Sequence, residues 1–359
     1  MTAVTHAEFH ADTLASDVAK AFAGSIRGRN IIVTGVNRGG IGFTTAQAFA
    51  SQSPTHIIIT GRSPTKLQES IEALQQEYPN VHYAGLKLDL SSQKSVREAA
   101  AELLAMEDIP TIDILVNNAG VMLIPERTLS EDGIEMHFAT NHVGHFLFTN
   151  LILPKLIKAA EGKPKGITRV VNVSSSSPLS AGVRFSDINF DKVNKTLPED
   201  EQPQYEALKH WGEKEPENKS YFPREGYNQS KVANLLFSIG FNARYYDKYG
   251  LLSLAVNPGV IATELQRNFP PELTSALEQW AKSGALHIKT QGAGAATSLV
   301  AATDPGLSLP VSKDGKENFG AYLSDCQIND GANARAVSNK NADRLWILSE
   351  ELVGESFSH

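Results

Sequence analysis

The sequence contains a single cysteine, Cys326, among its 359 residues. One cysteine cannot form an intramolecular disulfide, and it cannot build a zinc or iron–sulfur site that needs several thiolates. So little cysteine is compatible with a reducing compartment. We expect Cys326, which lies beside a predicted edge strand, to be a buried and unreactive thiol.

Long apolar runs and blocks of like charge are also missing. No stretch reaches the roughly 18 apolar residues that a membrane span needs, and residues 1–30 lack the apolar run of a secretory signal. The formal net charge is −7, from 33 basic and 40 acidic residues, and neither sign is gathered in one segment. These absences argue against nucleic acid and against a membrane as partners. We therefore expect a cytoplasmic protein that binds a small molecule.

Short apolar runs alternate with longer amphipathic segments along the chain. The runs are near-continuously apolar, as buried parallel strands are. The predicted strands are residues 30–34, 56–60, 81–89, 112–117, 168–174 and 251–257. Residues 64–78 and 91–107 have the pattern of helices, the second with Ser91 or Ser92 as its N-cap. This alternation predicts an α/β fold with a doubly wound parallel sheet, the Rossmann fold.

The predicted organisation is one Rossmann-type domain over residues 30–359, preceded by an N-terminal extension, residues 1–29. Two segments interrupt the strand–helix rhythm. Residues 191–225 are highly charged and rich in proline, which predicts an inserted surface excursion. Residues 264–290 follow a strand end with a less regular helical pattern, at a position where segments that cover a substrate usually lie.

A glycine-rich stretch, TGVNRGGIG (residues 34–42), follows the first predicted strand and runs into a helical pattern. Such a turn lets the backbone approach a pyrophosphate at a helix N-terminus. Its spacing has one residue more than the usual dinucleotide loops, and an ordinary strand-to-helix turn would also use glycines. We expect one glycine to make the turn and two to allow close approach. The candidate cofactor contacts are Gly35, Asn37, Arg38, Gly40, Ile41 and Gly42.

The end of the second predicted strand indicates which dinucleotide is bound. An NAD enzyme usually places an acidic residue there for the ribose 2′-hydroxyl, whereas this sequence reads TGRS. Arg62 and Arg38 could instead pair with a 2′-phosphate, which favours NADP(H). The alternative is that both arginines are solvated loop residues.

Polar residues also follow the third and fourth predicted strands. Asp89, next to Leu90, could bond an adenine amino group or could cap the following helix. The turn Asn118-Ala119-Gly120 is small enough to let the backbone reach a cofactor, although a plain turn needs no function.

Tyr227 and Lys231 lie four residues apart in a strongly helical pattern, so their side chains share one helix face. A nearby ammonium favours the phenolate, which predicts a lowered pKa for Tyr227. Tyr-x-x-x-Lys is common by chance, and its context is the serine run after the strand VVNVS, where a hydroxyl could polarise a carbonyl. Asn141, an amide within a helical segment, is a further hydrogen-bonding candidate.

In this linear order, the glycine loop, Asn-Asn-Ala-Gly, Asn, Ser, Tyr-x-x-x-Lys and Pro-Gly resemble the short-chain dehydrogenase/reductase superfamily over about residues 30–350. The C-terminal segments GAYLSDCQI and ADRLWILSEELVG resemble its retinol-dehydrogenase-like branch. The resemblance implies a catalytic tetrad of Asn141, Ser175, Tyr227 and Lys231. Tyr227 would be the general acid or base, Lys231 would hold the nicotinamide ribose, Ser175 would orient the carbonyl, and Asn141 would keep a water. The implied contacts of the nicotinamide are Tyr227, Lys231, Pro258, Gly259, Val260 and Thr263.

The resemblance implies an NADP(H)-dependent carbonyl reductase or alcohol dehydrogenase. Its substrate would be a ketone or aldehyde, which the loop aromatics suggest is bulky and apolar or polycyclic, although such residues also anchor loops. The alternatives are a dehydratase or epimerase that uses the same tyrosine, and a non-catalytic NADP-binding sensor. Dimers and tetramers are frequent in the family, so a homo-oligomer is an open expectation. His137, His142 and His145 lack matching ligands, and we expect no metal.

Overall fold

The computed structural model describes residues 2–210 and 212–357. Its centre is an eight-stranded sheet in the order β12-β11-β6-β5-β4-β1-β2-β3. Seven of these strands are parallel, and β12 pairs antiparallel with β11 at one edge. The strands are β1 (Asn30–Val33), β2 (His56–Gly61), β3 (His82–Lys87), β4 (Ile114–Asn117), β5 (Arg169–Val173), β6 (Leu252–Asn257), β11 (Tyr322–Ser324) and β12 (Gln327–Ile328). The predicted doubly wound parallel sheet is therefore confirmed.

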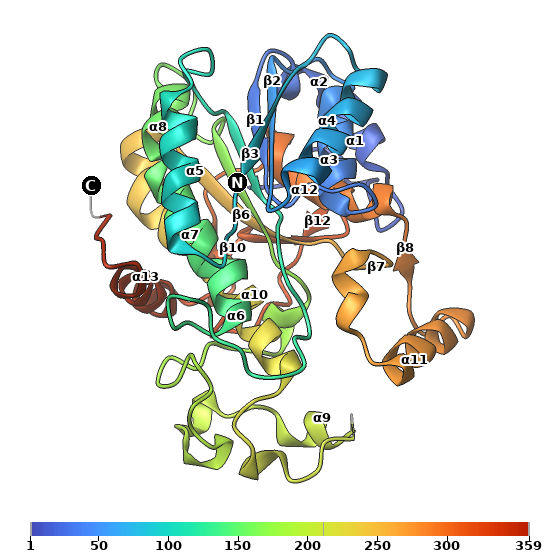
Figure 1. The fold of residues 1–359 in the computed structure, drawn as a ribbon, viewed down its shortest axis with the longest axis vertical. Helices are drawn as coiled ribbons and strands as arrows, with labels where there is room; N and C mark the ends of the chain where they lie inside the picture. The colour runs from blue at the N-terminus through green and yellow to red at the C-terminus, as the bar shows by residue number, and fades with distance from the viewer. Residues whose placement is uncertain (1, 211, 358–359) are drawn as a thin grey trace.

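Helices cover both faces of the sheet (Figure 1). One layer contains α5 (Gln93–Ala105), α7 (Gly144–Leu151), α8 (Leu153–Ala160), α10 (Pro223–Tyr249) and α13 (Asn339–Val353). The other contains α1 (Ala15–Ala21), α2 (Ala23–Ile26), α3 (Ile41–Ala50), α4 (Pro64–Glu77) and α12 (Gln291–Thr303). Successive residues of the central strands feed opposite layers: Ile32 packs in the first core, and Ile31 and Val33 pack in the second. Strands buried on both faces explain the continuous apolar runs of the sequence.

The third strand differs from the expectation of a buried run. β3 forms the outer edge of the sheet, where His82, Gly85 and Lys87 are exposed and Leu86 is buried. The helix that follows begins as predicted, and the structure chooses between the two N-cap candidates. The Ser92 hydroxyl accepts a hydrogen bond from the Ser95 amide at 3.3 Å.

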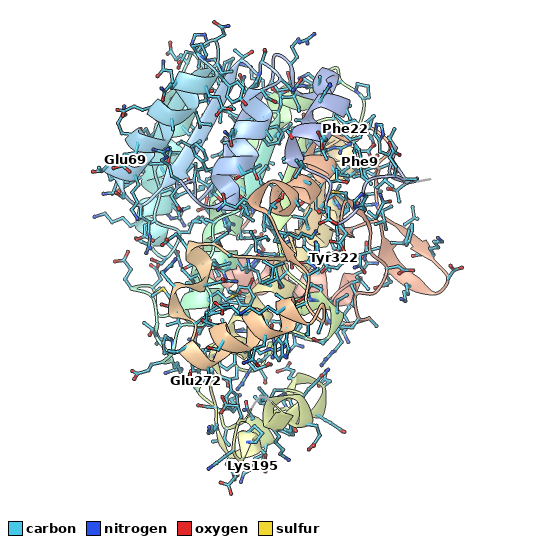
Figure 2. The ribbon with its side chains drawn as sticks, turned by 90° about the vertical axis from the view of Figure 1, so that its right-hand side faces the viewer. Phe9, Phe22, Glu69, Lys195, Glu272 and Tyr322 are labelled. Carbon is cyan, nitrogen blue, oxygen red and sulfur yellow. The ribbon has the colours of Figure 1, made fainter. Side chains whose placement is uncertain are left out.

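The N-terminal extension packs against the body of the protein. The Ala3 amide donates to the Gly306 carbonyl at 3.1 Å, and the Gln327 side chain donates to the carbonyl oxygens of His6 and Phe9. Phe9 and Phe22 lie near each other beside this edge of the molecule (Figure 2). Residues 1–29 therefore include a segment that is tied to the C-terminal part of the sheet.

The described residues of the charged excursion up to residue 222 form short helical elements, η3 (Asn194–Thr196), η4 (Glu199–Glu201), α9 (Tyr205–His210) and η5 (Pro216–Asn218). Residues 223–225 already belong to α10. It projects from the body, with Lys195 near its tip (Figure 2). Arg184 anchors its base, because the buried guanidinium contacts Asp187 at 2.5 Å and Asn194 at 2.7 Å and lies 4.3 Å from the Phe190 ring centre. A buried charge with this many partners holds the loop despite its poor apolar content.

The segment after β6 forms an arm that extends from the body of the protein (Figure 1). Its base is a two-stranded parallel ladder, β7 (Val260–Ile261) with β8 (Ile288–Lys289). The arm itself consists of η6 (Glu264–Asn268) and α11 (Pro271–Lys282), and no residue of α11 is buried.

The remaining elements are α6 (Met136–Phe138), the π-helical turn η1 (Ala139–Val143), the 3₁₀ turn η2 (Ser177–Leu179) and a surface hairpin of β9 (Val311–Lys313) and β10 (Lys316–Phe319). Among the residues that the structure describes, no helix combines the length and the apolar character that crossing a membrane requires.

Candidate active site

A large cleft opens along the carboxyl edge of the parallel strands. Its volume is about 1500 Å³, above the usual range for small-molecule sites and sufficient for a dinucleotide together with a substrate. The turns after the central strands line one side, and η6 and α11 line the other. The cleft spans the point between β1 and β4 where the strand order reverses, which is where open α/β sheets bind ligands.

The structure brings nearly all predicted site residues to this cleft. The predicted cofactor contacts that line it are Gly35, Asn37, Gly40, Ile41, Gly42, Arg62, Asp89, Leu90, Asn118, Ala119, Gly120, Tyr227, Lys231, Pro258, Gly259, Val260 and Thr263. Ser175 also lines it, and Asn141 is buried directly behind Gly120. Arg38 is exposed and lies outside the lining residues.

The enlarged glycine loop contains an additional β-turn. The Gly40 amide donates to the Asn37 carbonyl at 3.1 Å, so Arg38 and Gly39 occupy the two central turn positions. Gly39 has a φ of 84°, which the third position of a type II turn requires. The Gln291 side chain, at the start of α12, donates to the Gly39 carbonyl at 2.7 Å. The extra residue therefore places Arg38 at the exposed tip of this turn, outside the lining of the cleft.

Two glycines of the loop serve close packing. Gly35 has a φ of 68°, and a Cβ there would lie 2.6 Å from Ala119. Gly42 is buried in the first turn of α3, where a Cβ would lie 2.5 Å from the Asn118 amide nitrogen. We expected Gly42 to allow backbone to approach a pyrophosphate; its tight contact in the structure is with the Asn118 turn. This packing sets the N-terminus of α3 at the cleft wall.

A cluster of cationic side chains lies at the far end of the cleft, after β2. Arg62 and Lys66 both line it, and Ser63 caps α4 by accepting the Lys66 amide at 3.3 Å. The cap brings Lys66 to the first turn of the helix, one turn from Arg62. Lys66 was missed in the sequence because a lysine at a helix start is ordinary on its own. The role expected for Arg38 at a 2′-phosphate stays a prediction, and its exposed position does not favour it.

The turn after β4 is fixed by a buried network. The Thr34 hydroxyl accepts the amides of Asn118 at 2.9 Å and Ala119 at 3.0 Å and contacts His145 Nε2 at 2.8 Å. His145 Nδ1 lies 3.0 Å from the Asn141 carbonyl. That carbonyl can only accept, so Nδ1 carries the hydrogen and Nε2 accepts from Thr34. Burial lowers the pKa of His145 to about 4, which keeps this bridge neutral.

Asn141 lies in the π-helical turn η1, and its amide clamps the loop after β4. Its Oδ1 accepts the Val121 amide at 2.8 Å, and its Nδ2 donates to the Val121 carbonyl at 3.0 Å and to the Ser230 hydroxyl at 2.9 Å. A π-turn inside a helix is a frequent mark of a functional site. Asn141 thereby links this loop to the helix that carries Tyr227 and Lys231.

Ser175, Tyr227 and Lys231 meet at the floor of the cleft. The Lys231 ammonium donates to the Val173 carbonyl at 2.9 Å and lies 5.7 Å from the Tyr227 ring centre. Ser175 is held through its backbone, because the Tyr322 hydroxyl donates to the Ser175 carbonyl at 2.6 Å. Tyr322 was missed in the sequence, where a tyrosine in a strand gives no indication of what its hydroxyl contacts.

The pKa of Tyr227 contradicts the sequence-based expectation. Burial raises the pKa of Tyr227 to about 12, and a hydrogen bond with Ser175 only partly opposes that rise. Burial also lowers the pKa of Lys231 to about 8. We expected the ammonium to lower the tyrosine pKa; instead, both groups are held toward their neutral forms because burial penalises either charge.

The segment after β6 lines the cleft at the position predicted for the nicotinamide. The Asn257 side chain accepts the Gly259 amide at 3.0 Å, and Gly259 has a φ of 84°. A Cβ at Gly259 would lie 2.8 Å from the Lys289 side chain, whose ammonium pairs with Asp325 at 2.5 Å. Thr263 caps η6 through its hydroxyl. These contacts place the backbone of the Pro-Gly turn at the cleft wall.

The remaining polar candidates have structural partners. The Asp89 carboxylate accepts the amide and the hydroxyl of Ser91 at 3.0 and 2.7 Å, so it caps a turn while it lines the cleft. An adenine contact of Asp89 stays a prediction. His137 contacts Glu135 at 2.7 Å, and His142 contacts Ser349 at 2.7 Å. In the described part of the chain, no group of three or more potential ligands is placed to hold a metal ion.

Known proteins share both the sequence and the fold. A family model described as short chain dehydrogenase matches residues 29–186. Oxidoreductase fscI of Fusarium equiseti is 41% identical over 251 residues, which are 70% of this chain and 94% of that protein. Retinol dehydrogenase 12 of Homo sapiens is 33% identical over 348 residues, which are 95% of this chain and 93% of that protein.

A solved structure of an NADPH-bound carbonyl reductase from chicken fatty liver superimposes with a TM-score of 0.53 at 20% identity. The match covers 83% of this chain and 97% of that one. At this level of identity the likeness establishes the fold alone.

Proposed function

The chain belongs to the short-chain dehydrogenase family, in its retinol-dehydrogenase-like branch, and is an oxidoreductase by family; from this premise we propose that it is an NADP(H)-dependent carbonyl reductase. The same site would act as an alcohol dehydrogenase in the reverse direction. The observation that carries the proposal is the meeting of Ser175, Tyr227 and Lys231 at the floor of a cleft lined by the glycine loop.

The cleft fits a nicotinamide dinucleotide. Gly35 and Gly259 line the cleft with positive φ angles and carry no side chain, so their backbone can form the narrow walls that a pyrophosphate and a nicotinamide need. Arg62 and Lys66 provide positive charge at one end, which suits a 2′-phosphate. The NADPH carried by the chicken carbonyl reductase gives this choice further support. When bound, the cofactor supplies or accepts the hydride.

The chain's own residues handle the proton and the position of the carbonyl. Tyr227 is protonated at neutral pH, as a tyrosine with the ordinary pKa also is, so its hydroxyl is available as the acid that protonates the carbonyl oxygen during reduction. Ser175 lies beside that hydroxyl and orients the carbonyl. Lys231, fixed by the Val173 carbonyl, holds the cofactor ribose and, when protonated, supplies positive charge below the tyrosine.

The walls of the cleft favour an apolar substrate of some size. On α11, Leu273, Ala276, Leu277 and Trp280 recur at helical spacing and line the cleft, and none of them is buried. Phe222 faces the same cleft from the start of α10. An apolar helix face open to the cleft can be covered by a bulky ketone or aldehyde, including a polycyclic one.

A NADPH-oxidation screen over ketones and aldehydes of graded size tests this proposal. We expect loss of NADPH absorbance in proportion to alcohol formed, with kcat/KM rising as the apolar body grows. NADPH binding without oxidation of any carbonyl would overturn the proposal in favour of a sensor. Conversion without net oxidation would favour a dehydratase or epimerase.

A further inference from the structure

A chain of hydrogen bonds connects Ser175 to Glu225, a carboxylate that has no part in the proposed reaction. We propose that Ser177 and Asn228 are positioning residues which, together with Glu225, set the direction in which Ser175 offers its hydroxyl hydrogen. The catalytic role inferred here rests on the proposed function. The effect of these hydrogen bonds on the pKa of Tyr227 can nevertheless be measured without turnover.

Every link of this chain has hydrogen-bond length. The Ser175 hydroxyl contacts the Ser177 hydroxyl at 2.7 Å, and the Ser177 hydroxyl contacts the Asn228 Oδ1 at 2.8 Å. The Asn228 Nδ2 donates to Glu225 Oε1 at 3.2 Å. Ser177 is buried, so its hydroxyl has little access to bulk water as a substitute partner.

The chemistry of the end group fixes the direction of each bond. An ionised carboxylate only accepts, so Asn228 must turn its NH₂ toward Glu225 and its oxygen toward Ser177. Ser177 then donates its single hydrogen to Asn228, and it can only accept from Ser175. The Ser177 backbone amide also donates to the Ser175 hydroxyl oxygen at 3.0 Å. Without substrate, the Ser175 hydrogen is therefore directed at Ser177, and one lone pair is left for the Tyr227 side of the cleft. To orient a bound carbonyl, that hydrogen has to turn from Ser177 to the carbonyl oxygen.

This direction opposes ionisation of Tyr227. A hydrogen bond with Ser175 lowers the pKa of Tyr227 only when the serine hydrogen points at the phenolate oxygen. The chain competes for that hydrogen by directing it to Ser177. It thus favours the protonated tyrosine, which is the form that reduction of a carbonyl requires.

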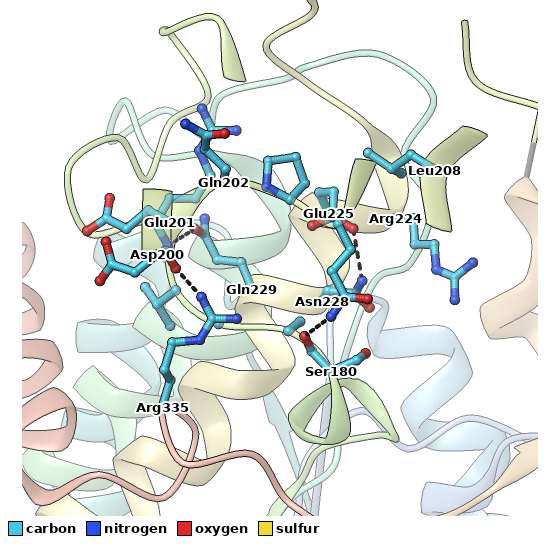
Figure 3. A pocket seen from close by; sticks show the side chains of 16 residues that line it. Ser180, Asp200, Glu201, Gln202, Leu208, Arg224, Glu225, Asn228, Gln229 and Arg335 are labelled. Carbon is cyan, nitrogen blue, oxygen red and sulfur yellow. Dashed lines mark hydrogen bonds between the residues drawn. The ribbon is translucent and has the colours of Figure 1, made fainter. Parts of the chain in front are cut away.

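Glu225 lies among charges of both signs on the wall of a small second cavity next to the main cleft (Figure 3). Burial raises the pKa of Glu225, while Asn228, Arg224 and Arg184 oppose that rise. Other charged groups that line this cavity are Asp200, Glu201 and Arg335. Figure 3 shows the Glu225 and Asn228 side chains facing each other across their hydrogen bond. When Glu225 is ionised it can only accept, and the direction of the hydrogen-bond chain is then enforced.

The test measures ionisation of Tyr227 in the cofactor-free protein. Tyrosine labelled with ¹³C at the ring ζ carbon gives one NMR signal per tyrosine, and loss of a signal in Tyr227→Phe assigns it. With a pKa of about 12, Tyr227 should be roughly a tenth ionised at pH 11. Ser177→Ala removes the hydroxyl that accepts from Ser175, and Asn228→Ala removes the group that accepts from Ser177. Each variant should lower the pKa of Tyr227 by about one unit, so that roughly half of Tyr227 is ionised at pH 11.

A conservative variant separates direction from structural damage. Ser177→Thr keeps the hydroxyl at this position, so it should titrate as the wild type does. Asp200→Asn, on the same cavity wall but outside the chain, is the matched control. Equal titration of Ser177→Ala, Asn228→Ala and wild type would overturn the inference, as would a pKa that falls equally in Ser177→Thr. A failed carbonyl screen would leave these titrations readable, so the two proposals fail separately.

Discussion

The structure distinguishes the basic residues that could set a preference for NADPH over NADH by whether they line the cleft. Arg62 and Lys66 line the cleft where the proposal places the adenosine, whereas Arg38 is exposed at the tip of a turn outside it. A hydrogen bond to a charged group contributes about 1.5–3 kcal/mol, and solvent exposure reduces this toward the lower end. We therefore expect Arg62→Ala and Lys66→Ala each to weaken NADP(H) binding by about 1–2 kcal/mol, or roughly 5- to 30-fold.

The assay compares dissociation constants for NADPH and NADH by nucleotide fluorescence or calorimetry, and it requires no substrate. NADH lacks the 2′-phosphate, so its affinity should change by less than about 2-fold in the same variants. The loss for NADPH should shrink at high salt, because exposed charges are screened within about 10 Å at 0.1 M ionic strength. Arg38→Ala is the matched control, with an unchanged ratio of the two affinities. A loss of preference in Arg38→Ala with none in Arg62→Ala or Lys66→Ala would refute the reasoning.

Three further substitutions test the site and its supports. Gly35→Ala should reduce the free energy of unfolding by about 2–4 kcal/mol, because its Cβ meets Ala119 at a positive φ; urea denaturation measures this. Lys231→Met should raise that free energy by about 3 kcal/mol at pH 7 while weakening cofactor binding, since burial lowers the lysine pKa from 10.5 to about 8. Between pH 8 and 10.5, Lys231 is protonated in the unfolded chain but neutral in the folded one. The free energy of unfolding of the wild type should therefore rise over this range relative to Lys231→Met. Arg184→Met should destabilise the folded excursion by about 3–5 kcal/mol, because the buried Asp187 carboxylate loses its ion-pair partner. Faster limited proteolysis of residues 191–225 would reveal this loss. An unchanged unfolding curve for Gly35→Ala, parallel pH profiles for Lys231→Met, or unchanged proteolysis for Arg184→Met would each contradict its prediction.

Much of the fold could be predicted because its determinants are local. Continuous β-branched runs such as residues 56–60 can be buried on both faces only inside a parallel sheet, and the intervening helices supply the two covers. The exception is β3, whose edge position depends on strand order, which hydrophobicity alone does not specify.

The site was predictable where a residue's role follows from its backbone or its element. Gly35, Gly40 and the pair Tyr227 and Lys231 reach the cleft because a strand end, a helix start and a helical spacing place them there. The outward position of Arg38 was not predictable, because one added residue can widen a loop in several ways and the turn at Gly39 selects one of them.

The electrostatics of the site depend on burial, which the sequence does not specify. The proximity of Lys231 to Tyr227 was visible in their spacing, and we expected it to favour the phenolate. In the folded protein burial raises the tyrosine pKa instead, and the hydrogen bond with Ser175 only partly opposes that rise. Lys66, Tyr322 and Asn228 were missed for a related reason, since their partners come from elements that are distant in sequence or from an ordinary helix turn.

The account's central claim is that Tyr227 protonates a carbonyl during NADPH-dependent reduction. The most direct test measures NADPH oxidation by the wild type and by Tyr227→Phe with the best ketone from the screen, alongside NADPH affinity. We predict that Tyr227→Phe binds NADPH within about 2-fold of the wild type and turns over at least roughly 100-fold more slowly. Retention of more than about a tenth of the wild-type rate by Tyr227→Phe would contradict the claim.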